Sequence, residues 1–80
     1  MNIDEWYDLR EIVESASAGE SSPLSQRYKD HPIAVAAAAY LKNRQQESII
    51  NDAAKSLAKL HPGVDPAFAE KHYWLVLAKN

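Results

Sequence analysis

The sequence contains no cysteine. A disulfide framework, a thiolate zinc site, an iron–sulfur cluster and a cysteine nucleophile are therefore excluded, and we expect a reducing, cytoplasmic location. Glycine is almost as scarce, because Gly19 and Gly63 are the only two. Phosphate-binding loops need several closely spaced glycines, so the sequence also excludes nucleotide-binding motifs of the Walker and dinucleotide types.

Long apolar stretches are lacking too. The longest, residues 33–41, is about half the length that a transmembrane helix needs. The first five residues, Met-Asn-Ile-Asp-Glu, are acidic, whereas a secretory leader is basic and then apolar. We therefore expect a chain that does not associate with membranes and is not processed.

The overall composition is that of a folded, soluble protein. Of the 80 residues, 46% are hydrophobic and 25% are charged, values close to the averages for globular domains. A chain of this length holds one hydrophobic core, so residues 1–80 are expected to form a single domain.

Apolar residues recur at helical spacing in the first half of the chain. Trp6, Leu9, Val13 and Ala16 predict a helix over residues 3–18, with Asn2 as its N-cap. A short helical turn is expected to begin at Ser22-Pro23 and to end by residue 31. The same arrangement recurs at Asp30-His31-Pro32, where an alanine-rich helix over residues 33–41 is expected at the centre of the bundle.

The second half predicts two more helices. Asn43 is a candidate cap for a helix that runs to about residue 60, and Asp65-Pro66 is a candidate start for a last helix over residues 66–79. Residues 72–78 also have high strand propensity, so helix and strand both stay open there.

These segments predict an all-α fold, a compact bundle of four to five short helices that self-associates into a dimer. The expected core consists of apolar residues from every long segment: Trp6, Leu9, Val13, Ile33, Ala37, Tyr40, Ile50, Ala53, Leu57, Leu60, Phe68 and Leu75.

Residues that carry chemistry are few and scattered. The histidines His31, His61 and His72 do not form the i, i+4 pair of a helical zinc site, and the serines of the first connection have no histidine and acid pattern nearby. We therefore expect neither an enzyme nor a metal or cofactor site.

Charge is distributed unevenly along the chain. Residues 1–20 hold six acids and one base, a local balance of −5, whereas the whole chain carries −2. Asp4, Asp8 and Glu11 fall opposite the apolar stripe of the first helix, with Glu14 nearby. The alternatives are an ordinary solvated face and a docking surface for a partner whose basic residues otherwise bind nucleic acid.

The other candidate feature is the apolar run near the C-terminus, Tyr73-Trp74-Leu75-Val76-Leu77. Successive helical positions turn by about 100°, so these side chains cannot all face one small core. We predict that Tyr73, Trp74 and Val76 contribute to an interface, either with a second copy or with another protein.

The sequence therefore favours a small, non-enzymatic protein–protein interaction module that occupies a surface of its partner. One alternative is an inhibitor of the kind found in phages and mobile elements, similar in type to anti-CRISPR proteins, that blocks a nucleic-acid-handling complex through its acidic face. Another is a DNA-binding regulator that uses Lys42, Arg44, Lys55 and Lys59, but the basic density around them is low, and we do not expect direct nucleic-acid binding.

Overall fold

The computed structural model describes residues 1–77, and all regular secondary structure in that part of the chain is helical. The expected all-α class is thus confirmed. In chain order the elements are α1 (Ile3–Ser17), the 3₁₀ turn η1 (Pro23–Ser25), α2 (Pro32–Lys42), α3 (Glu47–Lys59), α4 (Pro66–Lys71) and the 3₁₀ helix η2 (Tyr73–Leu77).

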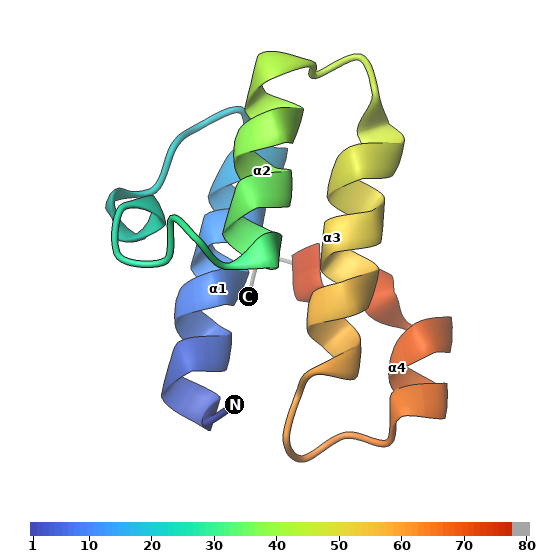
Figure 1. Cartoon of the computed structure of the whole chain (residues 1–80). Coiled ribbons are helices and arrows are strands. Elements are labelled where there is room, and N and C mark those ends of the chain that lie inside the picture. Colours follow the sequence, from blue (N-terminus) through green and yellow to red (C-terminus); the bar gives the residue numbers. More distant parts are fainter. Residues whose placement is uncertain (78–80) are drawn as a thin grey trace.

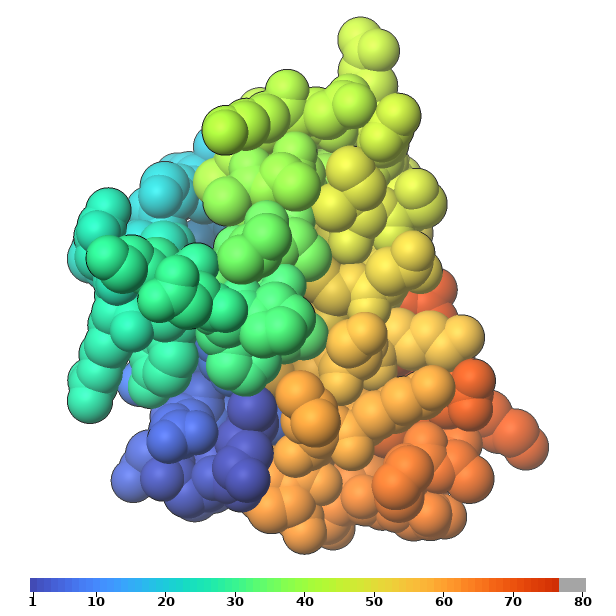
Figure 2. Space-filling view, viewed as in Figure 1, coloured from blue at the N-terminus to red at the C-terminus, as the bar shows by residue number. Residues whose placement is uncertain are grey.

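Helices α1 and α2 run in the same direction, and α3 returns antiparallel to α2 (Figure 1). This arrangement requires the connection between α1 and α2 to run back along the bundle. The connection forms one edge of the molecule beside α2 (Figure 2). The radius of gyration is 11.5 Å. A compact 80-residue domain is expected to have a value of about 11.6 Å.

Helix α1 is defined by its two ends. At the start, the Asn2 side chain accepts a hydrogen bond from the Glu5 backbone N–H at 2.8 Å, as predicted. At the end, Gly19 has φ of +83°, and its N–H donates to the Ala16 carbonyl while the Glu20 N–H donates to the Ser15 carbonyl. These two bonds form a Schellman motif, which requires the left-handed conformation that glycine adopts most easily.

The proline-led starts of the shorter elements are also confirmed. Ser22 caps η1, His31 caps α2 and Asp65 caps α4, each with a proline in the first turn. At α2 the cap is a ring nitrogen, because His31 Nδ1 accepts from the Ile33 N–H at 3.1 Å. Each cap satisfies a backbone donor that the helix itself leaves without a partner.

Helix α3, rather than α2, lies at the centre of the fold. It packs against α1, α2, α4 and η2, and its buried positions are correspondingly broad: Ile50, Ala53, Ala54, Leu57 and Ala58. Asn43 does not cap this helix. It is the C-cap of α2, its N–H donating to the Ala39 and Tyr40 carbonyls, and α3 begins after a further turn.

The predicted helix over residues 66–79 is wrong. Helix α4 ends at Lys71, His72 leaves the helical conformation with φ of −126° and ψ of 29°, and the chain continues as η2. Aromatic and β-branched residues dominate this stretch, and they are weaker helix formers than alanine or leucine. Residues 78 and 79 of that prediction lie outside the described part of the chain.

Nine of the twelve predicted core residues are buried, and three are not. Leu60 is 43% exposed because α3 ends one residue before it, so the helical spacing no longer applies. Phe68 and Leu75 are each 53% exposed because the helix expected to carry both is interrupted between them. The described core also includes Ile12, Ala16, Ala34, Ala54, Ala58, Ala69 and Val76.

Candidate protein-binding surface

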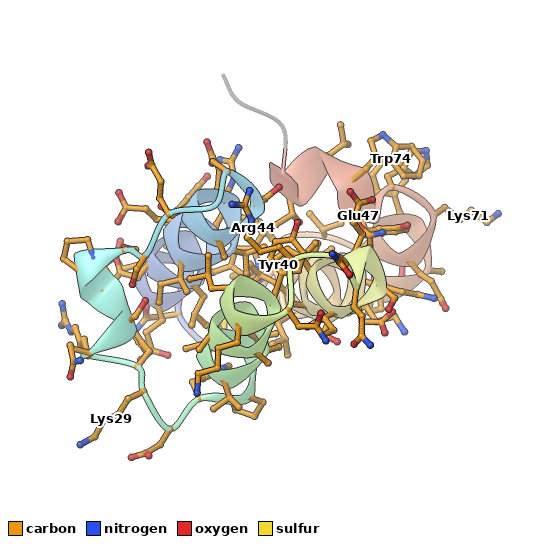
Figure 3. All side chains as sticks on the ribbon, turned by 90° about the horizontal axis from the view of Figure 1, so that it is seen from above. Lys29, Tyr40, Arg44, Glu47, Lys71 and Trp74 are labelled. Atoms are coloured by element: carbon orange, nitrogen blue, oxygen red, sulfur yellow. The ribbon has the colours of Figure 1, made fainter. Side chains whose placement is uncertain are left out.

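The 3₁₀ geometry of η2 decides which of its side chains reach solvent. In a 3₁₀ helix, side chains at i and i+3 lie on the same face. Val76 is buried and Tyr73 is partly buried against the core, while Trp74 and Leu75 between them are each 53% exposed. Figure 3 shows the Trp74 side chain pointing away from the long helices, on the side of α4 and η2.

Helix α4 adds further aromatic surface next to Trp74. The rings of Phe68 and His72, four residues apart, stack with centroids 4.3 Å apart and planes inclined by 21°. The His72 ring centroid in turn lies 5.2 Å from that of Trp74. His72 Nδ1 lies 3.0 Å from the Phe68 carbonyl oxygen, to which it donates in the tautomer that this contact favours. Three rings therefore form one continuous surface.

An apolar pocket of about 220 Å³ opens beside these rings. Residues of α1, α3, α4, η2 and the α3–α4 connection line it: Trp6, Tyr7, Arg10, Ala58, His61, Val64, Phe68, Ala69, His72, Leu75 and Val76. The Trp6 ring is held in place because its Nε1 donates to the Leu57 carbonyl oxygen at 2.7 Å. Four separate helical elements thus meet at this pocket.

Ion pairs connect α4 to α3 and so support one side of the pocket. Glu70 Oε1 lies 3.5 Å from Lys55 Nζ and 3.6 Å from Lys59 Nζ. The positive charge of Lys59, followed by the hydrogen bond and charge of Lys55, lowers the pKa of the Glu70 carboxyl. The pairs are exposed, so they orient α4 more than they stabilise it.

Arg10 separates the apolar pocket from a second depression. Its Nε donates to the Val76 carbonyl oxygen at 3.2 Å and lies 4.0 Å from Glu14 Oε2. The guanidinium therefore joins α1 to η2, 66 positions later in the sequence.

The second depression, here called the acidic groove, has a volume of about 340 Å³. It is lined by residues of α1 and of the segment just after it: Tyr7, Arg10, Glu11, Glu14, Ser15, Ala18 and Glu20. The lining therefore holds three carboxylates and one guanidinium. Because Tyr7 and Arg10 belong to both linings, the apolar pocket and the acidic groove adjoin each other.

The predicted acidic residues do not form one uniform ridge. Glu11 and Glu14 line the acidic groove, and Asp4 is exposed in the first turn of α1 outside it. Asp8 faces the connection before α2, where its Oδ2 accepts from the Tyr28 hydroxyl at 2.7 Å and lies 4.0 Å from Arg27 Nη1. The hydrogen bond to Asp8, with smaller effects of burial and of its negative charge, raises the pKa of Tyr28.

The predicted interface residues differ in their exposure to solvent. Trp74 is accessible, whereas Val76 is buried and Tyr73 partly buried, so a partner reaches Trp74 and Leu75 more readily than the other two. Sequence reasoning missed Tyr7, and a signal for it was present. Tyr7 lies on the polar side of α1, 52% exposed, where an aromatic residue has no core to join.

The described residues contain no group of three or more histidine, aspartate or glutamate side chains placed to hold a metal ion. Within the same residues, no helix is both long and apolar enough to cross a membrane. The polar groups next to the apolar pocket, mainly Arg10, His61 and His72, are suited to orienting a bound side chain by hydrogen bonding.

Comparison of the chain with protein-family models, with curated proteins and with solved structures finds no match. The functional argument therefore depends on the geometry of the surface described above.

Proposed function

We propose that this protein is a non-enzymatic protein–protein interaction module that binds its partner through the apolar pocket and the aromatic surface beside it. The observation that carries the proposal is the exposure of Phe68, Trp74 and Leu75, each 53% exposed and all in one neighbourhood. Contiguous apolar surface with a polar rim is typical of interaction sites.

Energetics support a protein ligand. Burying a large apolar side chain that is otherwise exposed contributes about 1.5–3 kcal/mol, and tryptophan is among the residues that most often dominate binding energy. Three such side chains around one pocket offer enough apolar surface for specific binding. An isolated exposed leucine would not offer that much apolar surface.

The size of the pocket also favours a protein side chain over a small metabolite. Pockets that enclose drug-sized ligands have volumes of roughly 300–1,000 Å³. The apolar pocket has about 220 Å³ and is open to solvent, so one bulky side chain fits it better than a whole cofactor.

The test is affinity capture from the native host with four versions of the chain. Wild type is compared with Phe68→Ala and Leu75→Ala, and with the matched control Val35→Ala, which removes an equally exposed apolar side chain from α2, outside the pocket. We expect wild type and Val35→Ala to capture the same proteins. With Phe68→Ala and with Leu75→Ala, the recovery of these proteins should fall at least tenfold. Circular dichroism checks that all four fold. Equal recovery with all versions would contradict the proposal.

Three measurements distinguish the narrower hypotheses. A captured nucleic-acid-handling complex would support the inhibitor, and sizing of the purified chain tests self-association. Retention on DNA at physiological salt would support the regulator. Against the regulator, Lys55 and Lys59 both lie beside the Glu70 carboxylate, which reduces the positive potential available to phosphates.

A further inference from the structure

We infer that the ligand is a linear peptide segment carrying one bulky apolar residue and a nearby lysine or arginine. The apolar side chain enters the apolar pocket, and the cation enters the acidic groove. The inference rests on the proposed function and adds the chemistry of the partner to it.

Continuity of the two depressions is the first argument. Tyr7 and Arg10 form part of both linings, so a segment seated in the apolar pocket passes directly over them toward Glu11 and Glu14. Recognition of a short segment through a side-chain pocket and an adjoining charged site is a common way for small domains to bind peptides. An extended chain advances about 3.3 Å per residue, so neighbouring residues of one segment reach adjoining sites.

Charge complementarity is the second argument. Arg10 is already bonded to the Val76 carbonyl oxygen and lies near Glu14. Glu11 and Glu20 are exposed, and neither makes an ion pair among residues 1–77. The groove therefore keeps an excess of negative charge, which attracts a cation and disfavours an acidic segment.

These features favour a peptide over a second copy of the chain. A two-fold contact places the same surface on both sides of the interface, so the carboxylates of both copies would enter it together. Arg10, already bonded within its own chain, is the only arginine or lysine among the described residues of the two linings. A concave pocket is also better filled by a projecting side chain than by the rims of an identical pocket.

The test uses labelled nine-residue peptides in a serine and glycine background, measured by fluorescence anisotropy. One set carries tryptophan or leucine with arginine two, three or four positions away, and matched sets replace the arginine by glutamate or the apolar anchor by alanine. We expect at least one arginine peptide to bind roughly tenfold more tightly than its glutamate counterpart at low salt, with the difference shrinking as salt rises. Replacing the anchor should abolish binding.

Charge reversal on the protein sharpens the test. The double variant Glu11→Lys with Glu20→Lys should prefer the glutamate peptide. The control Asp4→Lys with Asp52→Lys, which reverses two exposed carboxylates outside the groove, should keep the preference for arginine. Circular dichroism verifies that both variants fold.

The outcomes distinguish this inference from the proposed function. If the anchor and Leu75 are needed but arginine and glutamate peptides bind equally, the inference is wrong and the proposed function stands. If no peptide and no captured protein depends on Phe68 or Leu75, the proposed function fails as well. A dimer that Phe68→Ala dissociates would show that the occupant is a second copy, which also overturns the inference.

Discussion

At the scale of single residues, Leu57 joins the core to the binding surface. Its side chain is fully buried in the middle of the bundle, and its carbonyl oxygen accepts the Trp6 indole N–H. That carbonyl lies in the last turn of α3 and also accepts a hydrogen bond from the Leu60 backbone N–H at 3.0 Å. The hydrogen bond therefore gives the buried indole N–H an acceptor and fixes the Trp6 ring against the apolar pocket.

Replacing Leu57 by alanine should lower the free energy of unfolding by about 2–5 kcal/mol, because it removes buried surface and leaves a cavity. Small domains of this size hold only about 3–5 kcal/mol from their core, so much of the variant should be unfolded. Urea titration followed by circular dichroism measures the loss. The control Leu60→Ala removes the same side chain from an exposed C-cap and should cost about 1 kcal/mol or less. A similar loss in both variants would contradict the assigned burial.

Tyr28 predicts a particular dependence of stability on pH. The hydrogen bond to Asp8 raises its pKa in the folded state. The protonated phenol therefore contributes stability that is fully present below its unfolded pKa, about 10, and is lost as the pH rises through the folded value. Between pH 9 and 11.5 the melting temperature of wild type should fall more than that of Tyr28→Phe. The control Tyr7→Phe, which removes an exposed phenol, should follow wild type. Parallel curves for all three would show that the Asp8 contact has no effect on stability.

At the scale of elements, the sequence predicted some helix boundaries and missed others. The first helix and its Asn2 cap, and the starts at Pro32 and Pro66, follow from local chemistry and were predictable. The end of α4 was not, because the run after His72 is compatible with several backbone conformations, and contacts with α1 and α3 select among them. The exposure of Phe68 and Leu75 is a consequence of that selection.

Gly19 offers a direct test of helix termination. Its φ of +83° is unfavourable for any residue with a Cβ atom, and an added Cβ would lie 2.6 Å from the Arg44 side chain, which is exposed and able to move. Gly19→Ala should therefore reduce the free energy of unfolding by about 1–2 kcal/mol, mainly from the backbone. Gly63→Ala, at a glycine without a positive φ, should change it by less than about 0.5 kcal/mol. Equal effects in a thermal melt would contradict the Schellman assignment.

At the scale of the whole molecule, the two features that the sequence singled out separately turn out to be neighbours. Glu11 and Glu14 lie on α1, Leu75 lies on η2, and the Arg10 to Val76 contact brings the two elements together. No local pattern encodes that contact, because it depends on how α3 positions both elements. The residue types of the site were therefore predictable in part, and their assembly into a pocket with an adjoining groove was not.

The pairing of α1 with late parts of the chain also determines when the protein can fold during its synthesis. The side-chain hydrogen bond of Trp6 needs a carbonyl that lies 51 positions later in the sequence. The hydrogen bond of Arg10 needs a carbonyl that lies 66 positions later. At translation rates of about 5–20 residues per second, the second interval lasts roughly 3–13 s. Helical domains fold in microseconds to milliseconds once their contacts are present, so the ribosome, and not the fold, sets the pace. Until then α1 can pack against α2, but it lacks the contacts that α3 and η2 supply.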